Sequence, residues 1–181
     1  MNAVATIPAL LALLVATAAA ATDWRSGRIP NWLTLPPLVV APLGYGFALG
    51  PEAALRSVCA AALSGFVPYL LFRRGVMGGG DVKLLAALGA TTSFDLVGGI
   101  EIQLIAVAAS MLVALAALAW DGSLLETVSN ALLQVAKPVL PPRWRREPCD
   151  SLRTQVRMGG AILFATVVFV SPHLSVAWRA E

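Results

Sequence analysis

Two aspartates stand out among the ten acidic residues of this 181-residue chain. Asp23 directly follows a stretch, Met1–Thr22, that contains no charged residue, and Asp81 directly follows three glycines. Two carboxylates held close together share one proton, because both cannot ionise at short range. The ionised carboxylate then acts as a general base on a water molecule, and the protonated one polarises a peptide carbonyl. The pattern therefore predicts peptide-bond hydrolysis without a covalent intermediate.

Both aspartates also have a structural interpretation, which the sequence leaves open. Asp81 could cap the N-terminus of the helix that it begins, since aspartate is a favoured capping residue. Asp23 could form a surface ion pair with Arg25 or Arg28. The glycines of Gly78–Gly80 favour the catalytic interpretation, because a backbone without Cβ atoms can approach a bound peptide closely.

Other kinds of catalytic site lack the residues that they need. The chain has one histidine, His173, and two cysteines, Cys59 and Cys149, which are too few and too scattered for a zinc or haem site. It contains neither a Gly-x-Ser-x-Gly sequence for a serine nucleophile nor a Gly-Lys-Ser/Thr loop for a phosphate. A net charge of +3 is too small to indicate nucleic-acid binding. We therefore expect no metal, no cofactor and no nucleic-acid partner.

The composition places these aspartates in a membrane protein. Hydrophobic residues make up 58% of the chain and charged residues only 13%, about half the share of roughly 25% in soluble domains. A further stretch, Leu84–Ile100, is apolar but interrupted by Asp95. We predict an all-α integral membrane protein with about six transmembrane helices, forming one domain over residues 1–181. Five charge-free stretches come close to the roughly 20 residues that cross a bilayer as a helix, namely Met1–Thr22, Ile29–Pro51, Ser57–Phe72, Ile102–Trp120 and Met158–Trp178.

The expected helices place both aspartates at helix ends, next to a short loop at 23–31 and a glycine-rich loop at 75–80. The fourth helix is short, so we expect the loop before it to dip into the membrane. The polar stretch 121–157 is expected to be a cytoplasmic loop, with an amphipathic surface helix over 123–136 and a basic segment on lipid headgroups. The six expected helices cover residues 3–22, 32–49, 53–72, 81–92, 102–120 and 158–175.

Basic residues indicate the orientation of the chain in the cytoplasmic (inner) membrane. With six spans, all of the 13 basic residues except Arg56 and Arg179 fall in or beside the loops after the first, third and fifth spans. Because basic loops stay in the cytoplasm, we expect a multi-pass protein with its N-terminus outside. Asp23 and Asp81 are then both expected at the cytoplasmic face, at the same depth.

The residues around the two aspartates resemble a known family. The run Asp23–Asn31, which reads DWRSGRIPN, is similar to the first aspartate motif of the type IV prepilin peptidases. The run Gly78–Leu84, which reads GGGDVKL, is similar to their Gly-x-Gly-Asp motif with its following lysine. A third similarity is partial: at Val156–Ala161 the family tends to have Pro-Tyr-Gly-x-Ala, and here Arg157–Met158 replaces Pro-Tyr.

The resemblance implies an aspartic endopeptidase of the cytoplasmic membrane. Such an enzyme removes the basic leader of prepilins or pseudopilins at the cytoplasmic face, and its partners are these substrates, membrane lipids and the pilus assembly machinery. Carried over to this chain, Asp23 and Asp81 are the expected catalytic pair. The residues expected to shape the site or the substrate contact are Gly78, Gly79, Gly80, Lys83, Arg25, Ile29, Pro30 and Asn31.

One departure from the family narrows the subgroup. The large bacterial enzymes carry a cytoplasmic domain with Cys-x-x-Cys pairs, linked to a methylating activity, and this sequence has no such pair. It therefore looks like the short, peptidase-only form of tight-adherence (Flp-type) pilus systems. The archaeal preflagellin peptidases, which share the two aspartates, stay an alternative. Two further alternatives are a non-catalytic scaffold of a pilus or secretion system and a transporter that uses Asp81 or Asp95 in a proton path.

The predicted orientation can be tested with reporter fusions. A fusion after Gly75 is expected to report a cytoplasmic position and a fusion after Gly50 an external one, since these residues flank the third span. A cysteine introduced at Gly75 should stay inaccessible to a membrane-impermeant thiol reagent added from outside. External labelling of this cysteine would contradict the orientation and move the aspartates away from the cytoplasm.

Overall fold

The computed structural model describes residues 3–120, residue 122 and residues 158–179. Within these residues the chain forms helices and no strands, which confirms the all-α prediction. The predicted loop 121–157, with its surface helix and basic segment, lies outside the described residues apart from Gly122. The helices are α1 (Ala3–Ser26), α2 (Asn31–Leu49), α3 (Pro51–Arg73), α4 (Gly79–Thr91), α5 (Gly98–Trp120) and α7 (Gly159–Arg179).

The end of the first helix differs from the prediction. The sequence placed Asp23 in a loop after residue 22, whereas α1 continues to Ser26 and Asp23 lies in its last turn. Gly27 ends the helix: it has a φ of 63°, in the left-handed region that glycine adopts at no steric cost, and its N–H donates to the carbonyl of Asp23 at 2.8 Å. The helix therefore stops at the glycine of the first motif and not at its aspartate.

Four helices are long and apolar enough to cross a membrane, which supports an integral membrane protein. Two further helices fall short of this: α7 has a shorter apolar stretch, Gly159–Leu174, and α4 has 13 residues. At 1.5 Å per residue α4 is about 20 Å long, less than the roughly 30 Å hydrocarbon core of a bilayer. The remaining two spans of the six-span prediction stay predictions. The four candidate spans are Thr6–Ser26, Asn31–Leu49, Pro51–Arg73 and Gly98–Ala117.

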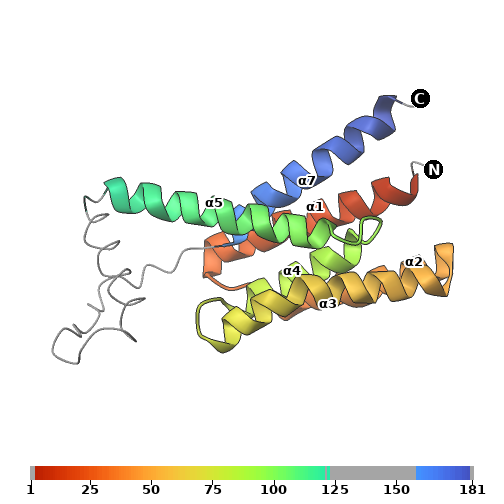
Figure 1. The fold of residues 1–181 in the computed structure, drawn as a ribbon, viewed down its shortest axis with the longest axis horizontal. Helices are drawn as coiled ribbons and strands as arrows, with labels where there is room; N and C mark the ends of the chain where they lie inside the picture. Colours follow the sequence, from red (N-terminus) through yellow and green to blue (C-terminus); the bar gives the residue numbers. More distant parts are fainter. Residues whose placement is uncertain (1–2, 121, 123–157, 180–181) are drawn as a thin grey trace, which may run out of the picture. The chain divides into compact units, whose positions relative to one another are not determined.

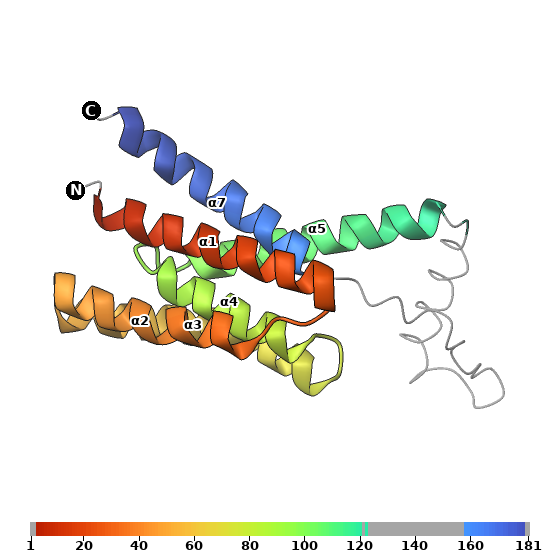
Figure 2. The same ribbon diagram turned by 180° about the vertical axis from the view of Figure 1, so that it is seen from behind.

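The chain divides into two compact units, one of residues 1–109 with 157–181 and one of residues 110–156. The first unit holds both aspartates, and α5 begins in it. In this unit α1 and α7 run antiparallel side by side, and α4 packs against α2, α3 and α1 (Figures 1 and 2). That the whole chain is a single membrane domain stays a prediction.

Small side chains fill the contact between α1 and α7. The buried face of α1 is a row of alanines, which forms one core with apolar residues of α7 such as Ile162 and Val170. Small residues allow close helix approach, and van der Waals packing holds membrane helices together where no water is expelled. Large apolar side chains such as Leu14, Phe47 and Phe66 are exposed on the outer surfaces, as expected for helices in contact with lipid. The fully buried alanines are Ala9, Ala12, Ala16 and Ala19.

The helices approach closely where α3, α4 and the start of α5 meet. Ser64 of α3 is fully buried between Gly89 of α4 and Gly99 of α5. A Cβ at Gly89 would overlap the Ser64 hydroxyl and lie 2.7 Å from the carbonyl oxygen of Ala60. Glycine at this position therefore fixes how deeply α4 sits against α3.

This contact predicts that Gly89→Ala destabilises the protein. The backbone of α3 would have to shift, and overpacking of this kind costs about 1–3 kcal/mol. Gly44→Ala is the matched control, because a Cβ at Gly44 of α2 meets nothing within 4 Å. Thermal unfolding in detergent should give a lower midpoint for Gly89→Ala than for Gly44→Ala, and equal midpoints would contradict this account of the packing.

Candidate active site

Asp23 is held in place by the start of another helix. It lies in the last turn of α1, is only 8% exposed, and accepts a hydrogen bond at Oδ2 from the backbone N–H of Gly159 at 3.0 Å. Gly159 is the first residue of α7, so its N–H has no partner within its own helix. Arg25 and Arg28 are both exposed. The observed partner of Asp23 is thus a buried backbone group and not a surface arginine.

Asp81 lies in the first turn of α4, outside the four long apolar helices. The helix begins after Gly78, which has an extended backbone (φ −73°, ψ 143°), and the backbone of Gly78 forms a hydrogen bond with the Asp81 carboxylate. The carboxylate folds so closely over Gly78 that a Cβ there would lie 3.0 Å from Oδ2. The N-cap of α4 is Gly78 and Asp81 is the third residue of the helix, so Asp81 is not the N-cap residue that the sequence left open.

The charges of the two aspartates interact. Burial, as the larger cause, and the negative charge of Asp23 raise the pKa of the Asp81 carboxyl from 3.8 to about 6, against the hydrogen bond from Gly78. Between about pH 4 and pH 6 Asp81 therefore mostly holds its proton, whereas an ordinary aspartate is mostly ionised there. A carboxyl that keeps its proton at this pH can donate it to a carbonyl oxygen.

The glycines before Asp81 bring the second motif against the first. A Cβ at Gly80 would lie 3.0 Å from the Cβ of Ile29 and 3.3 Å from its carbonyl oxygen, and Ile29 is buried. A Cβ at Gly79 would lie 3.2 Å from the ring of Phe72 at the end of α3. The start of α4 thus packs closely between the loop after α1 and the end of α3, and a side chain at either glycine would require its neighbour to shift by a few tenths of an ångström.

A second link joins the two motifs at the surface. The Nζ of Lys83 donates a hydrogen bond to Oδ1 of Asn31 at 2.8 Å. Asn31 is the first residue of α2, and Pro30 precedes it as the N-cap with an extended backbone. Six of the eight residues expected to shape the site therefore make contacts where the motifs meet or beside the start of α4. They are Gly78, Gly79, Gly80, Lys83, Ile29 and Asn31.

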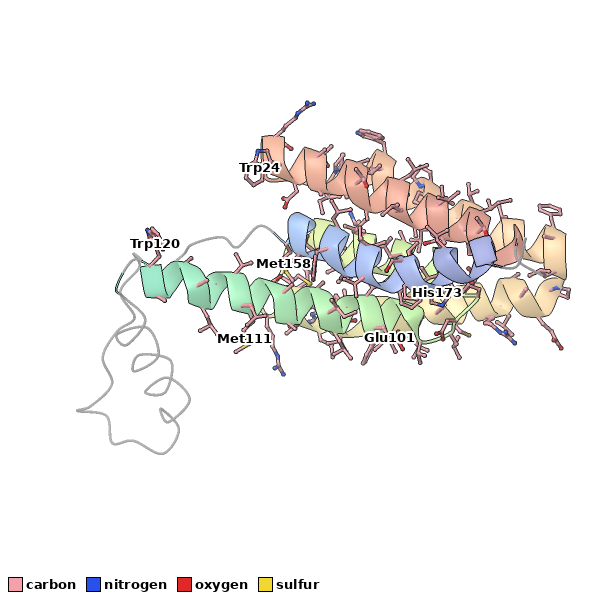
Figure 3. All side chains as sticks on the ribbon, turned by 90° about the horizontal axis from the view of Figure 1, so that it is seen from above. Trp24, Glu101, Met111, Trp120, Met158 and His173 are labelled. Carbon is pink, nitrogen blue, oxygen red and sulfur yellow. The ribbon has the colours of Figure 1, made fainter. Side chains whose placement is uncertain are left out.

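The sequence prediction missed Gly159. A Cβ at this position would lie 2.7 Å from Oδ2 and 2.8 Å from the Cβ of Asp23, so the close approach of α7 to α1 requires glycine. The signal that could have found it is the partial Gly-x-Ala match at Val156–Ala161. Figure 3 shows Met158, the residue before α7, at the same end of the unit as Trp24, the neighbour of Asp23.

Glu101, His173 and Asp95 have no part in this pair. Figure 3 shows Glu101 and His173 away from Trp24 and Met158, in the direction of the other end of the unit. Asp95 accepts a hydrogen bond from the Val97 N–H at 3.1 Å and so stabilises the turn before α5. In the described part of the chain, no three His, Cys, Asp or Glu side chains gather in a group that could hold a metal ion.

An apolar cavity of about 380 Å³ lies between α1 and α2, also remote from the aspartates. Ile7 and Leu11 of α1 and Val40 and Ala48 of α2 are among its lining residues. Leu11 precedes Asp23 by twelve positions on the same helix, or about 18 Å at 1.5 Å per residue. The cavity is therefore not part of the carboxylate site.

Comparison with known proteins identifies one family. A family model described as the type IV leader peptidase family matches residues 10–119, which is more than half of the chain and includes both aspartate motifs. Gly159 lies beyond the matched residues. No curated protein and no solved structure matches the chain.

The charge interaction predicts how the Asp81 carboxyl titrates. Asp23→Asn removes the negative charge, so the pKa of Asp81 should fall from about 6 toward 3.8 while burial keeps it above that value. A ¹³C NMR titration of aspartate-labelled protein measures this, with the Asp81 signal assigned by its loss in Asp81→Asn. The titration midpoint should not move in the control Asp95→Asn. An unchanged midpoint in Asp23→Asn would show that the two carboxylates do not interact.

Proposed function

Because this chain belongs to the type IV leader peptidase family, we propose that it is an aspartic endopeptidase that removes the leader of prepilins or pseudopilins. The observation that carries the proposal is the electrostatic coupling of Asp23 and Asp81, two carboxylates from the two family motifs. Asp23 is buried and Asp81 partly buried, in the last turn of α1 and the first turn of α4. Figure 1 shows that α1 ends and α4 begins at the same end of the helical unit. A bound peptide and a water molecule between them would meet a base and an acid together.

The proposed reaction uses one water molecule and no covalent intermediate. The ionised carboxylate takes a proton from water, the water oxygen bonds to the carbonyl carbon, and the protonated carboxyl gives its proton to the carbonyl oxygen. In the second step the first carboxyl gives its proton to the amide nitrogen, and the second takes one from the gem-diol as the C–N bond breaks. Each carboxyl then returns to its starting protonation state.

The position of the pair fits a substrate that is part soluble and part membrane-embedded. A prepilin has a basic leader followed by an apolar helix, so its scissile bond lies at the membrane boundary. Asp23 lies at the end of a candidate span and Asp81 at the start of a short helix beside it. We propose that this end faces the cytoplasm, where the leader is removed before the subunits reach the pilus assembly machinery.

The proposal predicts that both aspartates are required for cleavage. Purified protein in lipid vesicles is incubated with an Flp-type prepilin, and leader removal is followed by mass spectrometry. Asp23→Asn and Asp81→Asn should each lower the rate by at least about a hundredfold, the usual contribution of an acid or base. Asp95→Asn is the matched control, because Asp95 only stabilises a turn remote from the pair, and it should cleave at the wild-type rate.

Three outcomes separate the alternatives. Wild-type cleavage rates in either aspartate variant would contradict the assignment of the pair. A scaffold would be indicated by two results together: the purified wild-type protein cleaves no prepilin, and a host strain that lacks the protein still processes its prepilins normally. If the protein cleaves an archaeal preflagellin in preference to a prepilin in the same assay, the substrate assignment is wrong and the proposed reaction of the two aspartates still holds.

A further inference from the structure

The hydrogen bond between Gly159 and Asp23 joins residues 136 positions apart in the chain. It is made by the first residue of α7, and both partners are buried. The first N–H groups of a helix have no intrahelical acceptors, and the end of the helix carries a partial positive charge. A carboxylate placed there receives a hydrogen bond from a fixed backbone donor.

The contact engages one oxygen of the carboxylate only. Oδ2 of Asp23 accepts from Gly159, and within the described residues no hydrogen bond to Oδ1 is found. Oδ1 is therefore the oxygen left for a water molecule. Because Oδ2 is held, the carboxylate plane cannot turn freely about its Cβ–Cγ bond.

We propose that Gly159 is a positioning residue of the active site, whose backbone N–H anchors Oδ2 of Asp23 and so presents Oδ1 to the reacting water. The inference rests on the proposed function, since it assigns a role within the same reaction. It makes α7 the third element of the site, although this helix lies outside the residues that match the family. Gly159 acts through Asp23 and touches no reacting atom.

The absence of a side chain is part of this role. A Cβ at Gly159 would meet Oδ2, Cβ and Cγ of Asp23 at 2.7, 2.8 and 3.1 Å, whereas a Cβ at the adjacent Gly160 meets nothing within 4 Å. Alanine is otherwise a better helix former than glycine. Gly159→Ala should therefore displace the carboxylate and abolish prepilin cleavage, and Gly160→Ala should cleave normally.

A second variant removes the N–H of Gly159 without adding an atom to the contact between α7 and α1. It tests the positioning role even if Gly159→Ala fails to fold. Glycolic acid in place of Gly159 converts the amide to an ester, which removes the N–H and adds no side chain. An ester at 159 also makes the Met158 carbonyl a weaker acceptor, and this carbonyl accepts a hydrogen bond from the Ile162 N–H at 2.9 Å. An ester at 160 weakens the preceding helix carbonyl in the same way. The ester at 160 is therefore the matched control.

The expected result is a loss in kcat with KM unchanged. A hydrogen bond to a charged group contributes enough for about a tenfold to hundredfold fall in kcat for the ester at 159, and the ester at 160 should stay within about twofold. Equal rates for the two esters, or a rise in KM with an unchanged kcat, would overturn the positioning role. If the unmodified protein cleaves no prepilin, the proposed function fails and this role with it; if it cleaves and the esters match, only this role fails.

Discussion

Two carboxylates that repel each other are held at the same end of this helical unit, and much of the local structure follows from keeping them there. Burial and repulsion by Asp23 both disfavour the ionised form of Asp81, and they raise the pKa of its carboxyl. Backbone N–H groups offset part of the cost of holding the two carboxylates there: Gly159 donates to Asp23, and Gly78 forms a hydrogen bond with Asp81. Each donor lies at the start of a helix, where such groups have no partner within the helix.

The same constraint explains why glycine surrounds the pair. A Cβ at Gly159 would lie 2.7 Å from Oδ2 of Asp23, and a Cβ at Gly78 would lie 3.0 Å from Oδ2 of Asp81, so a side chain at either position would crowd a carboxylate. Gly80 lets the start of α4 pack on Ile29 of the first motif. Further along α4, Gly89 allows close packing on α3 and so sets the depth of the helix. The position of Asp81 thus depends on close contacts along the whole of α4.

The sequence predicted the helical membrane fold and the family, because both depend on local signals. Charge-free stretches indicate spans, and the residues around Asp23 and Asp81 carry the family motifs. The end of α1 was predicted wrongly because Asp23 precedes polar residues that favour a loop, whereas only Gly27 adopts the backbone that ends the helix. Gly159 was not predicted as a partner of Asp23: the partial Gly-x-Ala match at Val156–Ala161 marks the residue, but a local pattern does not indicate a contact across 136 positions.

The claim that the two carboxylates act as one catalytic unit is tested most directly by combining their variants. When two residues act together in one reaction step, replacing one of them already removes most of their joint contribution to the rate. Replacing the second residue as well then lowers the rate little further. Leader cleavage by wild type, Asp23→Asn, Asp81→Asn and the double variant is measured over incubations long enough to quantify residual rates. We predict that the double variant is no slower than the slower single variant. Losses that multiply in the double variant would show that the aspartates act independently, and would contradict the shared role.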